Sequence, residues 1–336
     1  MRYICVCKEK VRRKINKMAF NPNFNAFQSR TPLLQLLISF LIVLVIGLLL
    51  FPILILAGSK ISGVDASLIG SYSFGSGIRE AGFLKFTLLS QDISFFIIPA
   101  IVILSRFNPG HQNNILNISS LRLRDMILVI ILAFCAFPVT SLAGELNSKL
   151  VLPGLLSGVE QWMKDKEDYA NHLMDLLMAP ETLSGLWMNI LIIACIPAIG
   201  EELIFRGIFQ KLFQNIFKSG HLSVWFTSLI FSAVHFQFYG FLPRFLLGLI
   251  FGYLFLWTKN LWLPVLAHFI NNAVPTVWSY MKGWETINEK SSASPAEQSV
   301  VVILSIVAGS LILVYFRRRS AGKTDENHGI SGLSGI

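Results

Sequence analysis

Two adjacent glutamates, Glu201 and Glu202, lie in an otherwise apolar stretch of the chain, PAIGEELIFRGIFQ. Arg206 follows Glu202 at spacing i+4, so these two residues share one helix face and can form an ion pair. Glu201 lies about 100° further around the helix and has no such partner. The spacing therefore predicts one neutralised carboxylate and one free carboxylate. A free carboxylate in an apolar setting can act as a general base, taking a proton from water and later returning it.

Two of the six histidines lie inside apolar runs, His235 in LIFSAVHFQFYG and His268 in LPVLAHFINNAVP. His268 and Asn272 are spaced i, i+4, so they present an imidazole and an amide on one helix face. Polar groups at membrane depth are costly unless they pair or line a wet cavity, so we expect these residues to meet the glutamates. A base, two imidazoles and a hydrogen-bond donor can activate water and stabilise an oxyanion, which amide hydrolysis requires.

The alternative reading is purely structural. A lone histidine in a hydrophobic helix is more often packed core, and a buried Glu202–Arg206 pair can fix helix packing in a transporter or scaffold. This reading does not explain why Glu201, His235 and His268 are present in apolar segments. A catalytically silent binding or immunity protein and a proton-coupled transporter remain as further alternatives, although we find no inverted repeat in the sequence.

The elements that position these residues are predicted to be membrane helices. The chain has 336 residues, of which 54% are hydrophobic and 14% charged, and its mean hydropathy is +0.62. Soluble domains carry about 25% charged residues, so a soluble globular protein is excluded. Apolar blocks separated by short polar connections are typical of membrane spans. The predicted fold class is an all-α, polytopic integral membrane protein with about eight transmembrane helices.

The predicted spans are roughly Leu33–Ala57, Phe83–Ser105, Met126–Leu146, Leu186–Phe213, Leu222–Tyr239, Phe245–Thr258, Leu261–Met281 and Val300–Phe316. The first apolar block starts after residue 30 and is too long for a cleavable signal peptide. These limits place Glu201 nearer the cytoplasmic face than His235. If the two residues act together, either the fourth helix extends deeper into the membrane than these limits, or the fifth helix starts later.

The distribution of charge predicts the orientation of the chain. Basic residues precede the first span, and Arg317, Arg318 and Arg319 follow the last. Both termini are therefore expected on the cytoplasmic side of the membrane, which we infer to be a bacterial inner (cell) membrane. The acidic loop between residues 147 and 184 fits the outer side. Its segment Val159–Met178 has apolar residues at helical spacing and predicts an amphipathic surface helix. The net charge of +9 thus reflects topology, and no nucleic-acid partner is expected.

Other polar positions carry weaker signals. Asp92 is an intramembrane carboxylate, for which we favour a structural role over a functional one. Of the four cysteines, Cys5 and Cys7 lie in the basic tail and Cys135 and Cys195 in spans, so no disulfide framework is implied. Met18 offers a second possible start of translation, which would make both tail cysteines irrelevant. The segment from Ser320 onward is expected to be disordered.

Three motifs occur in order in the second half of the chain. EELIFR fits EExxxR, FSAVH fits FxxxH and HFINN fits HxxxN. Together they resemble the CAAX protease and bacteriocin-processing (CPBP, or Abi) family, over about residues 185 to 280. The resemblance divides the chain into a basic cytoplasmic tail (1–30), N-terminal helices with the outer amphipathic helix (31–182), a CPBP-like catalytic core (183–282), an outer loop with the last span (283–316) and a cytoplasmic tail (317–336).

The resemblance implies an intramembrane glutamic endopeptidase. By its motif positions, Glu201 activates water, His235, His268 and Asn272 hold the water or stabilise the oxyanion, and Glu202 and Arg206 support them. Such an enzyme would act on hydrophobic or membrane-anchored peptides, with membrane lipid as its other partner. HExxH is absent, and we favour no metal cofactor. Zinc held by Glu201, His235 and His268 is the alternative.

Overall fold

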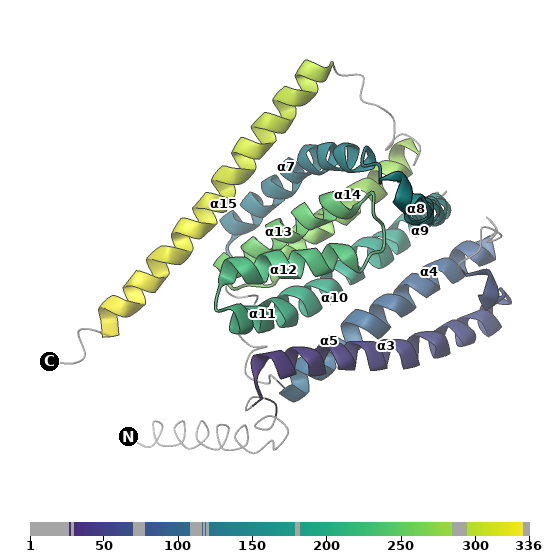
Figure 1. Ribbon diagram of the computed structural model, residues 1–336, viewed down its shortest axis with the longest axis horizontal. Helices are drawn as coiled ribbons and strands as arrows, with labels where there is room; N and C mark the ends of the chain where they lie inside the picture. Colours follow the sequence, from purple (N-terminus) through teal and green to yellow (C-terminus); the bar gives the residue numbers. More distant parts are fainter. Residues whose placement is uncertain are drawn as a thin grey trace.

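The computed structural model describes residues 27, 30–69, 78–107, 116, 118, 121–178, 182–283 and 294–331, with only the backbone given for residues 68, 78, 106, 107 and 322–331. Within these ranges every regular element is helical (Figure 1). Six helices or continuous helical runs are long and apolar enough to cross a membrane. The prediction of an all-α, polytopic integral membrane protein is therefore confirmed.

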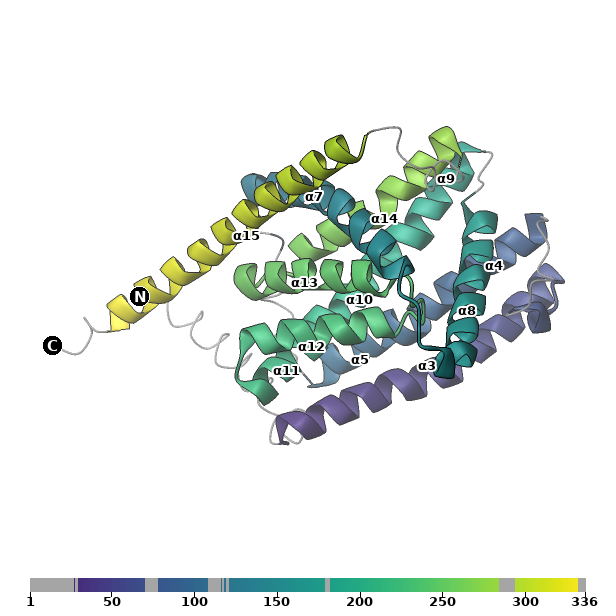
Figure 2. The same cartoon turned by 45° about the horizontal axis from the view of Figure 1, so that its top comes forward.

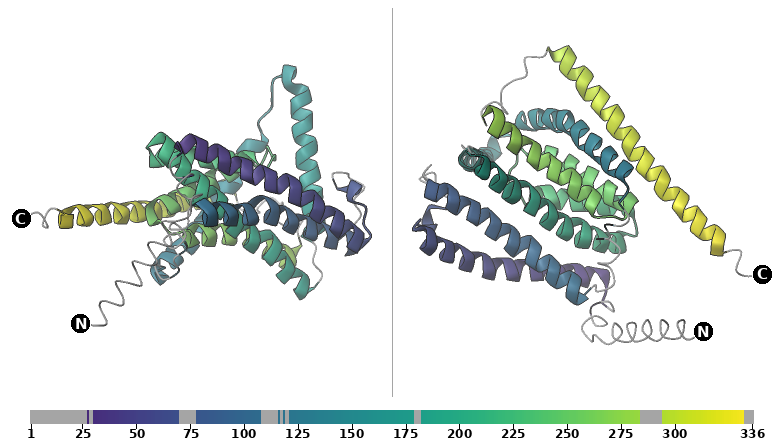
Figure 3. Two further views of the ribbon diagram at one scale, coloured as in Figure 1. Left: turned by 90° about the horizontal axis from the view of Figure 1, so that it is seen from below. Right: turned by 180° about the vertical axis from the view of Figure 1, so that it is seen from behind.

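The helices lie in a layered bundle, seen from the front in Figure 1 and from behind in Figure 3. Along one edge run α3 (Pro32–Ser62) and a second rod, in which α4 (Ile78–Asp92) continues through a π turn (Ile93–Ile97) into α5 (Ile98–Phe107). Along the other edge run α7 (Leu123–Ser148) and α15 (Pro295–Ser331). The helices that carry the three motifs lie between these edges.

The boundaries of α3 follow from its terminal residues. Thr31 caps its N-terminus by accepting a hydrogen bond from the Leu34 N–H, and Pro32 occupies the first turn, where a missing N–H costs nothing. The helix ends at Gly63, whose φ of 72° suits glycine. Only 11% of its apolar window is buried inside the protein, which leaves most of α3 to lipid.

One continuous rod of 35 residues, Leu183–Phe217, carries the first motif. It consists of α9 (Leu183–Asn189), α10 (Ile196–Ile204) and α11 (Gln210–Phe217), joined by π turns at Ile190–Cys195 and Phe205–Phe209. The first π turn ends just before Pro197, which lacks the N–H that an α-helix would require at that position. Both π turns therefore flank the nine residues that present the glutamates.

A short hairpin carries the second motif. Helix α12 (Gly220–Ala233) is followed by a tip, residues 234–240, and by α13 (Phe241–Thr258), which packs along α12. The 14 residues of α12 span about 21 Å, less than the roughly 30 Å of a bilayer core. The predicted span Leu222–Tyr239 is therefore wrong in its extent: its helix ends before His235, and the tip lies part-way through the bundle.

Of the two explanations for the depth expected of Glu201 and His235, a later start of the fifth helix is wrong, because α12 begins at Gly220, before the predicted Leu222. The rod of α9 to α11 begins before and ends after the predicted Leu186–Phe213 span, while α12 stops short. Helix α14 (Trp262–Lys282) carries the third motif; it is long enough to cross a membrane but is not among the six apolar runs. Each of the eight predicted spans thus corresponds to a helix, although α12 and α14 lack the length or apolarity of the others.

The amphipathic helix predicted at Val159–Met178 is present as α8 (Ser157–Leu177). It runs across the direction of the other helices, as Figure 2 shows. At the C-terminal end, α15 continues through Ser331, where disorder was expected, so that expectation is corrected. The basic tail before Phe27, with Cys5 and Cys7, lies outside the described residues; Cys135 and Cys195 are free thiols.

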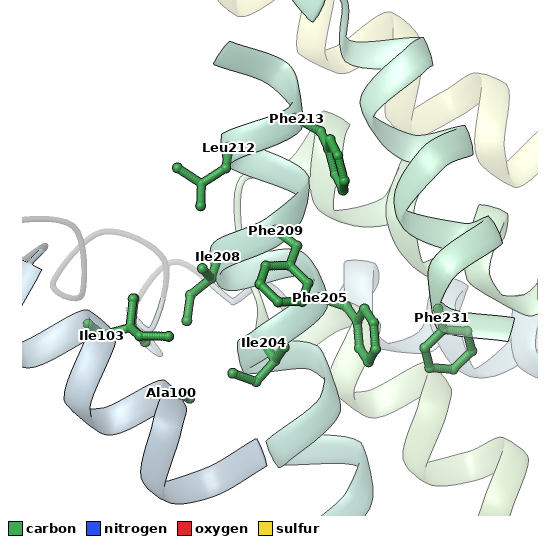
Figure 4. Close-up of a cluster of buried hydrophobic side chains, with 10 residues drawn as sticks. Ala100, Ile103, Ile204, Phe205, Ile208, Phe209, Leu212, Phe213 and Phe231 are labelled. Atoms are coloured by element: carbon green, nitrogen blue, oxygen red, sulfur yellow. The ribbon is translucent and has the colours of Figure 1, made fainter. Parts of the chain in front are cut away.

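Two apolar clusters meet at the centre of the bundle. The first joins α5, the rod of α10 and α11, and α12, and includes Phe205 and Phe231 (Figure 4). The second joins α7, α13, α14 and α15, and includes Phe251. Phe231 and Phe251 both contact the same two polar residues, Arg206 and His268. The polar residues of the three motifs therefore lie where the two clusters join.

Candidate active site

The predicted ion pair between Glu202 and Arg206 is present. Arg206 Nη1 donates to Glu202 Oε1 at 2.8 Å, and both side chains are 0% exposed. Arg206 Nη2 donates to the Gly248 carbonyl of α13 at 3.1 Å. Charges buried this deeply persist only when paired and hydrogen bonded, so the pair also fixes the rod against α13.

Aromatic rings complete the surroundings of the arginine. The guanidinium carbon lies 4.7 Å from the centre of the Phe231 ring and 5.4 Å from that of Phe251. Such cation–π contacts are stronger where water is excluded. Arg206 is thereby held by one ion pair, one carbonyl and two rings that come from α12 and α13.

His268 lies between the two glutamates. Its Nδ1 donates to Glu202 Oε1 at 3.0 Å, because an ion-paired carboxylate can only accept. Its Nε2 then faces Glu201 Oε2 at 3.9 Å. The ring stacks on Phe251, with centroids 5.1 Å apart and an interplanar angle of 19°. Glu202 thus orients the imidazole that faces Glu201.

Glu201 differs from its neighbour in its partners. The residue is 8% exposed, and its Oε2 has no hydrogen-bond partner among the described residues. Its nearest ion-pair contact is the 3.9 Å approach to His268, which is too long for a direct hydrogen bond. A buried carboxylate oxygen without a hydrogen-bond partner in the protein is the kind of group expected of a base that binds water.

His235 follows the end of α12 and belongs to the tip of the hairpin. Its Nδ1 is 2.7 Å from the Phe231 carbonyl and donates to it, which leaves Nε2 as an acceptor in the neutral ring. Its ring meets the Phe231 ring edge-on at 5.2 Å. Glu201 and His268 are both close enough to act on it electrostatically. His235 is therefore adjacent to the glutamate pair without a direct hydrogen bond to it.

Asn272 lies one turn beyond His268 on α14. Its Nδ2 donates to the Ile193 carbonyl at 3.2 Å, and its Oδ1 accepts from Asn271 at 3.2 Å. The Ile193 carbonyl belongs to the π turn before α10, where the Ile196 N–H bonds to the Leu191 carbonyl, five residues back. Asn272 thus joins α14 to this turn of the rod. No hydrogen bond between Asn272 and Glu201 is recorded.

Sequence reasoning missed two features of the site. Gln210 continues the row of Glu202 and Arg206 by four residues, and its Nε2 donates to the Gly252 carbonyl at 3.0 Å. Gly248 and Gly252 are also four apart, so two polar side chains bind two carbonyls in register. The repeated spacing of four in both helices was the available signal.

Asp92 lies where α4 meets its π turn and is 6% exposed. It is close enough to Glu201 for their charges to interact. The rod approaches this π turn closely at Gly200, where an added Cβ would lie 3.0 Å from Phe96. The structural role favoured for Asp92 is not tested by these contacts.

The zinc alternative was checked against the arrangement of possible ligands. Within the ranges described, no three His, Cys, Asp or Glu side chains are grouped closely enough to hold a metal ion. Glu201, His235 and His268 are neighbours, but they do not converge on one point. The residues present therefore do not fit a preformed zinc site, and no step below is derived through a metal.

Comparison with known proteins places these residues in a family. Residues 183–274 match the family model described as type II CAAX prenyl endopeptidase, Rce1-like. The uncharacterised protein YpbD of Bacillus subtilis (strain 168) is 33% identical over 90 residues, which cover 26% of this chain and 43% of that protein. The match thus spans less than half the length of this relative. No solved structure matches the chain.

The matched segment contains all three motifs, from Glu201 to Asn272. Residues 183–274 are therefore Rce1-like in sequence, which confirms the resemblance to the CAAX protease and bacteriocin-processing family over this range. The helices outside it, α3 to α8 and α15, are not covered by the match.

Proposed function

We propose that this protein is an intramembrane endopeptidase of the CAAX type, which hydrolyses peptide bonds in or near the membrane by a glutamate-activated water. The observation that carries the proposal is the division of roles between two adjacent carboxylates. Glu202 Oε1 binds Arg206 and His268, whereas Glu201 Oε2 has no hydrogen-bond partner among the described residues and lies 3.9 Å from His268 Nε2. A water between those two atoms would be held and deprotonated.

The proposed reaction assigns a step to each group. Glu201 takes a proton from the water, and the resulting hydroxide attacks the carbonyl carbon of the substrate peptide bond. His235, whose Nδ1 proton is used on the Phe231 carbonyl, presents Nε2 as an acceptor that orients the water. Glu201 then returns the proton to the amine nitrogen as the C–N bond breaks.

The oxyanion is assigned to α14. His268 lies between two carboxylates, so it can carry a second proton and donate from Nε2 to the tetrahedral intermediate. Asn272 uses one Nδ2 hydrogen on the Ile193 carbonyl and retains a second N–H for the same purpose. Glu202 and Arg206 are positioning residues, because they contact His268 and α13 and not the free oxygen of Glu201.

The substrate class proposed is a hydrophobic or membrane-anchored peptide, since the polar site lies between apolar helices that cross the membrane. The matched family model names CAAX prenyl endopeptidases, which supports a membrane-anchored substrate without identifying it. A bacterial inner membrane with both termini in the cytoplasm remains part of the proposal, supported by the basic residues that flank the first and last spans.

Glu201→Gln tests the proposal directly. The amide keeps the shape of the side chain but cannot accept the proton, so proteolysis should fall by about 10²-fold or more with little change in abundance or melting temperature. Membrane-anchored peptides are compared in cells with the wild type, Glu201→Gln, or Glu145→Gln as a matched control. Glu145 forms an exposed i, i+4 pair with Lys149. More than about a tenth of wild-type turnover in Glu201→Gln would contradict the assignment.

Metal content provides a second test. If Glu201 works unassisted, purified active protein should contain well under one equivalent of zinc, and extended chelation should leave activity intact. Zinc bound through Glu201, His235 and His268 would instead be lost together with activity when a ligand is replaced. Elemental analysis of the wild type beside His268→Ala separates the two cases; stoichiometric zinc that disappears in the variant would overturn the metal-free mechanism.

A further inference from the structure

The hairpin tip that carries His235 is held in an unusual conformation. Phe236, the next residue, has a φ of 52°, a left-handed value that a bulky residue adopts only when its surroundings enforce it. The His235 side chain donates to the Phe231 carbonyl, and its backbone N–H donates to the Ser232 carbonyl at 3.4 Å. Because both partners lie on α12, the other side of His235 depends on the contacts that fix residues 236–240.

Arg244, in the first turn of α13, fixes the tip from within. Its Nη1 donates to the Gln237 carbonyl at 3.2 Å, and its Nη2 donates to the Gln237 side-chain oxygen. A Cβ at position 240 would lie 2.3 Å from Nη1, so Gly240 leaves the space that the guanidinium fills. The planar guanidinium thus makes two hydrogen bonds to Gln237 at once and links α13 to the tip, which the ammonium group of a lysine could not reproduce.

Helices outside the family match fix the tip from the other side. Asn147 of α7 donates to the Phe238 carbonyl at 2.6 Å, and the Trp162 ring of α8 lies 5.2 Å from the Phe238 ring. The Glu167 carboxylate of α8 accepts from the Tyr239 N–H and lies close enough to Arg244 to attract it. Two consecutive residues of the tip, Phe238 and Tyr239, are therefore held by α7 and α8.

We propose that Arg244 is a positioning residue for His235, and that through the tip it makes the outer helix α8 part of the catalytic unit. The inference rests on the proposed function, because it assigns Arg244 a role in that reaction. Arg244 carries a charge inside the bundle, and both hydrogen bonds of its side chain within the described residues are to Gln237. A core that only needed packing would not require a forked cation there.

The test uses Arg244→Gln, the milder Gln237→Ala and a matched arginine control, Arg124→Gln. Arg124 packs its guanidinium 5.1 Å from the Tyr315 ring, away from the tip. Hydrogen exchange of residues 234–240 should become about tenfold faster in the first two variants and stay unchanged in the control. Modification of His235 by diethyl pyrocarbonate, measured against His221 in the same molecule, should also become faster.

Kinetics on a peptide found to be cleaved in the cell comparison separates positioning from other roles. A displaced His235 should lower kcat by up to about 100-fold and leave KM unchanged. A raised KM at constant kcat would mean that Arg244 contacts the substrate, and would overturn the proposal. A lowered melting temperature with normal kcat in the folded fraction would reduce Arg244 to a structural residue.

Failure of this inference is distinguishable from failure of the proposed function. If the wild type cleaves peptides but exchange at the tip is unchanged in Arg244→Gln, the positioning role is wrong and the protease assignment stands. If the wild type cleaves nothing, the protease assignment fails, and with it the role of Arg244 in catalysis. The exchange and modification rates then report only on whether the tip is held as described.

Discussion

Two glutamate–cation pairs in this chain have the same spacing and nearly the same length, in opposite surroundings. Glu202 and Arg206 are i, i+4 with their charged atoms 2.8 Å apart, and both side chains are 0% exposed. Glu145 and Lys149 are also i, i+4, at 2.7 Å, with side chains 60% and 65% exposed. Sequence spacing alone cannot separate these pairs, because spacing sets only which side chains can meet.

Because of burial, the two pairs differ in the free energy that is lost when one partner is removed. The exposed pair exchanges contacts with water at little cost, whereas the buried pair has no solvent to replace a lost partner. The buried pair also has further partners: Glu202 accepts from His268, and Arg206 donates to the Gly248 carbonyl. An ion pair with such cross-links determines where helices α13 and α14 sit, and the exposed one determines nothing beyond its own turn.

Breaking both pairs in the same way should give the largest contrast. Glu202→Ala leaves Arg206 charged in an apolar setting and His268 Nδ1 without its acceptor, at an expected cost of about 3–5 kcal/mol. Glu145→Ala should cost no more than about 0.5 kcal/mol. Abundance and thermal unfolding of the two variants in the same detergent measure the difference. A stable but inactive Glu202→Ala protein would mean that the two carboxylates have been assigned the wrong way round.

The close packing of α12 against α13, beside the carbonyl that Arg206 binds, can be tested by replacing glycines with alanine. A Cβ added at Gly248 would lie 2.9 Å from the Ser228 Cβ and 3.1 Å from its Cα, so α12 and α13 would have to separate. Gly248→Ala should therefore destabilise the protein by about 1–3 kcal/mol. Gly82→Ala in α4 has nothing within 4 Å and should gain about 0.5–1 kcal/mol. The same melting temperature for both variants would contradict this packing.

The smallest expected effect concerns pH at the outer helix. Burial raises the pKa of Glu167 above its ordinary value of 4.5, against the opposing influence of Arg244 and the Tyr239 N–H, while Asp168 adds to the rise. A raised pKa in the folded state contributes stability below 4.5 that is lost as pH rises through the folded value. The effect should stay under about 1 kcal/mol, because the carboxylate remains partly hydrated.

Glu167→Gln should remove this dependence, because the amide can still accept from Tyr239 but does not ionise. Melting temperatures of the wild type and the variant, measured from pH 4 upward, should converge at low pH and separate as pH rises, with the variant the more stable. Parallel curves would contradict the assignment of the dependence to Glu167.

Local spacing accounts for what the sequence predicted correctly. The Glu202–Arg206 pair follows from i, i+4 geometry, and the membrane helices follow from apolar blocks of sufficient length. The amphipathic helix α8 likewise follows from its own periodicity. The assignment of His235 and His268 to one region rested on the cost of leaving polar groups unpaired in lipid, and the structure brings both close to Glu201.

Tertiary contacts account for what could not be predicted. The hydrogen bond from His268 to Glu202 joins residues 66 apart in the chain, and no local sequence pattern specifies which glutamate the imidazole binds. The extent of α12 depended on the contacts of its tip with α7 and α8, which ended the helix within an apolar run. The acceptor for Asn272 is a carbonyl of the π turn, 79 residues away in the chain, which no local sequence pattern identifies.

The two π turns around α10 have a consequence for insertions and deletions. Each turn accommodates one residue more than a regular helix would, so the loss of a single residue at Ile190–Cys195 or Phe205–Phe209 could restore an unbroken α-helix without breaking the rod. Because the wide turn absorbs its extra residue, such a deletion would leave the faces of the rod on either side of it in nearly the same register. Loss of one residue within a π turn should therefore be tolerated better than the same loss in a regular helix such as α3, where it would turn one end by about 100° relative to the other.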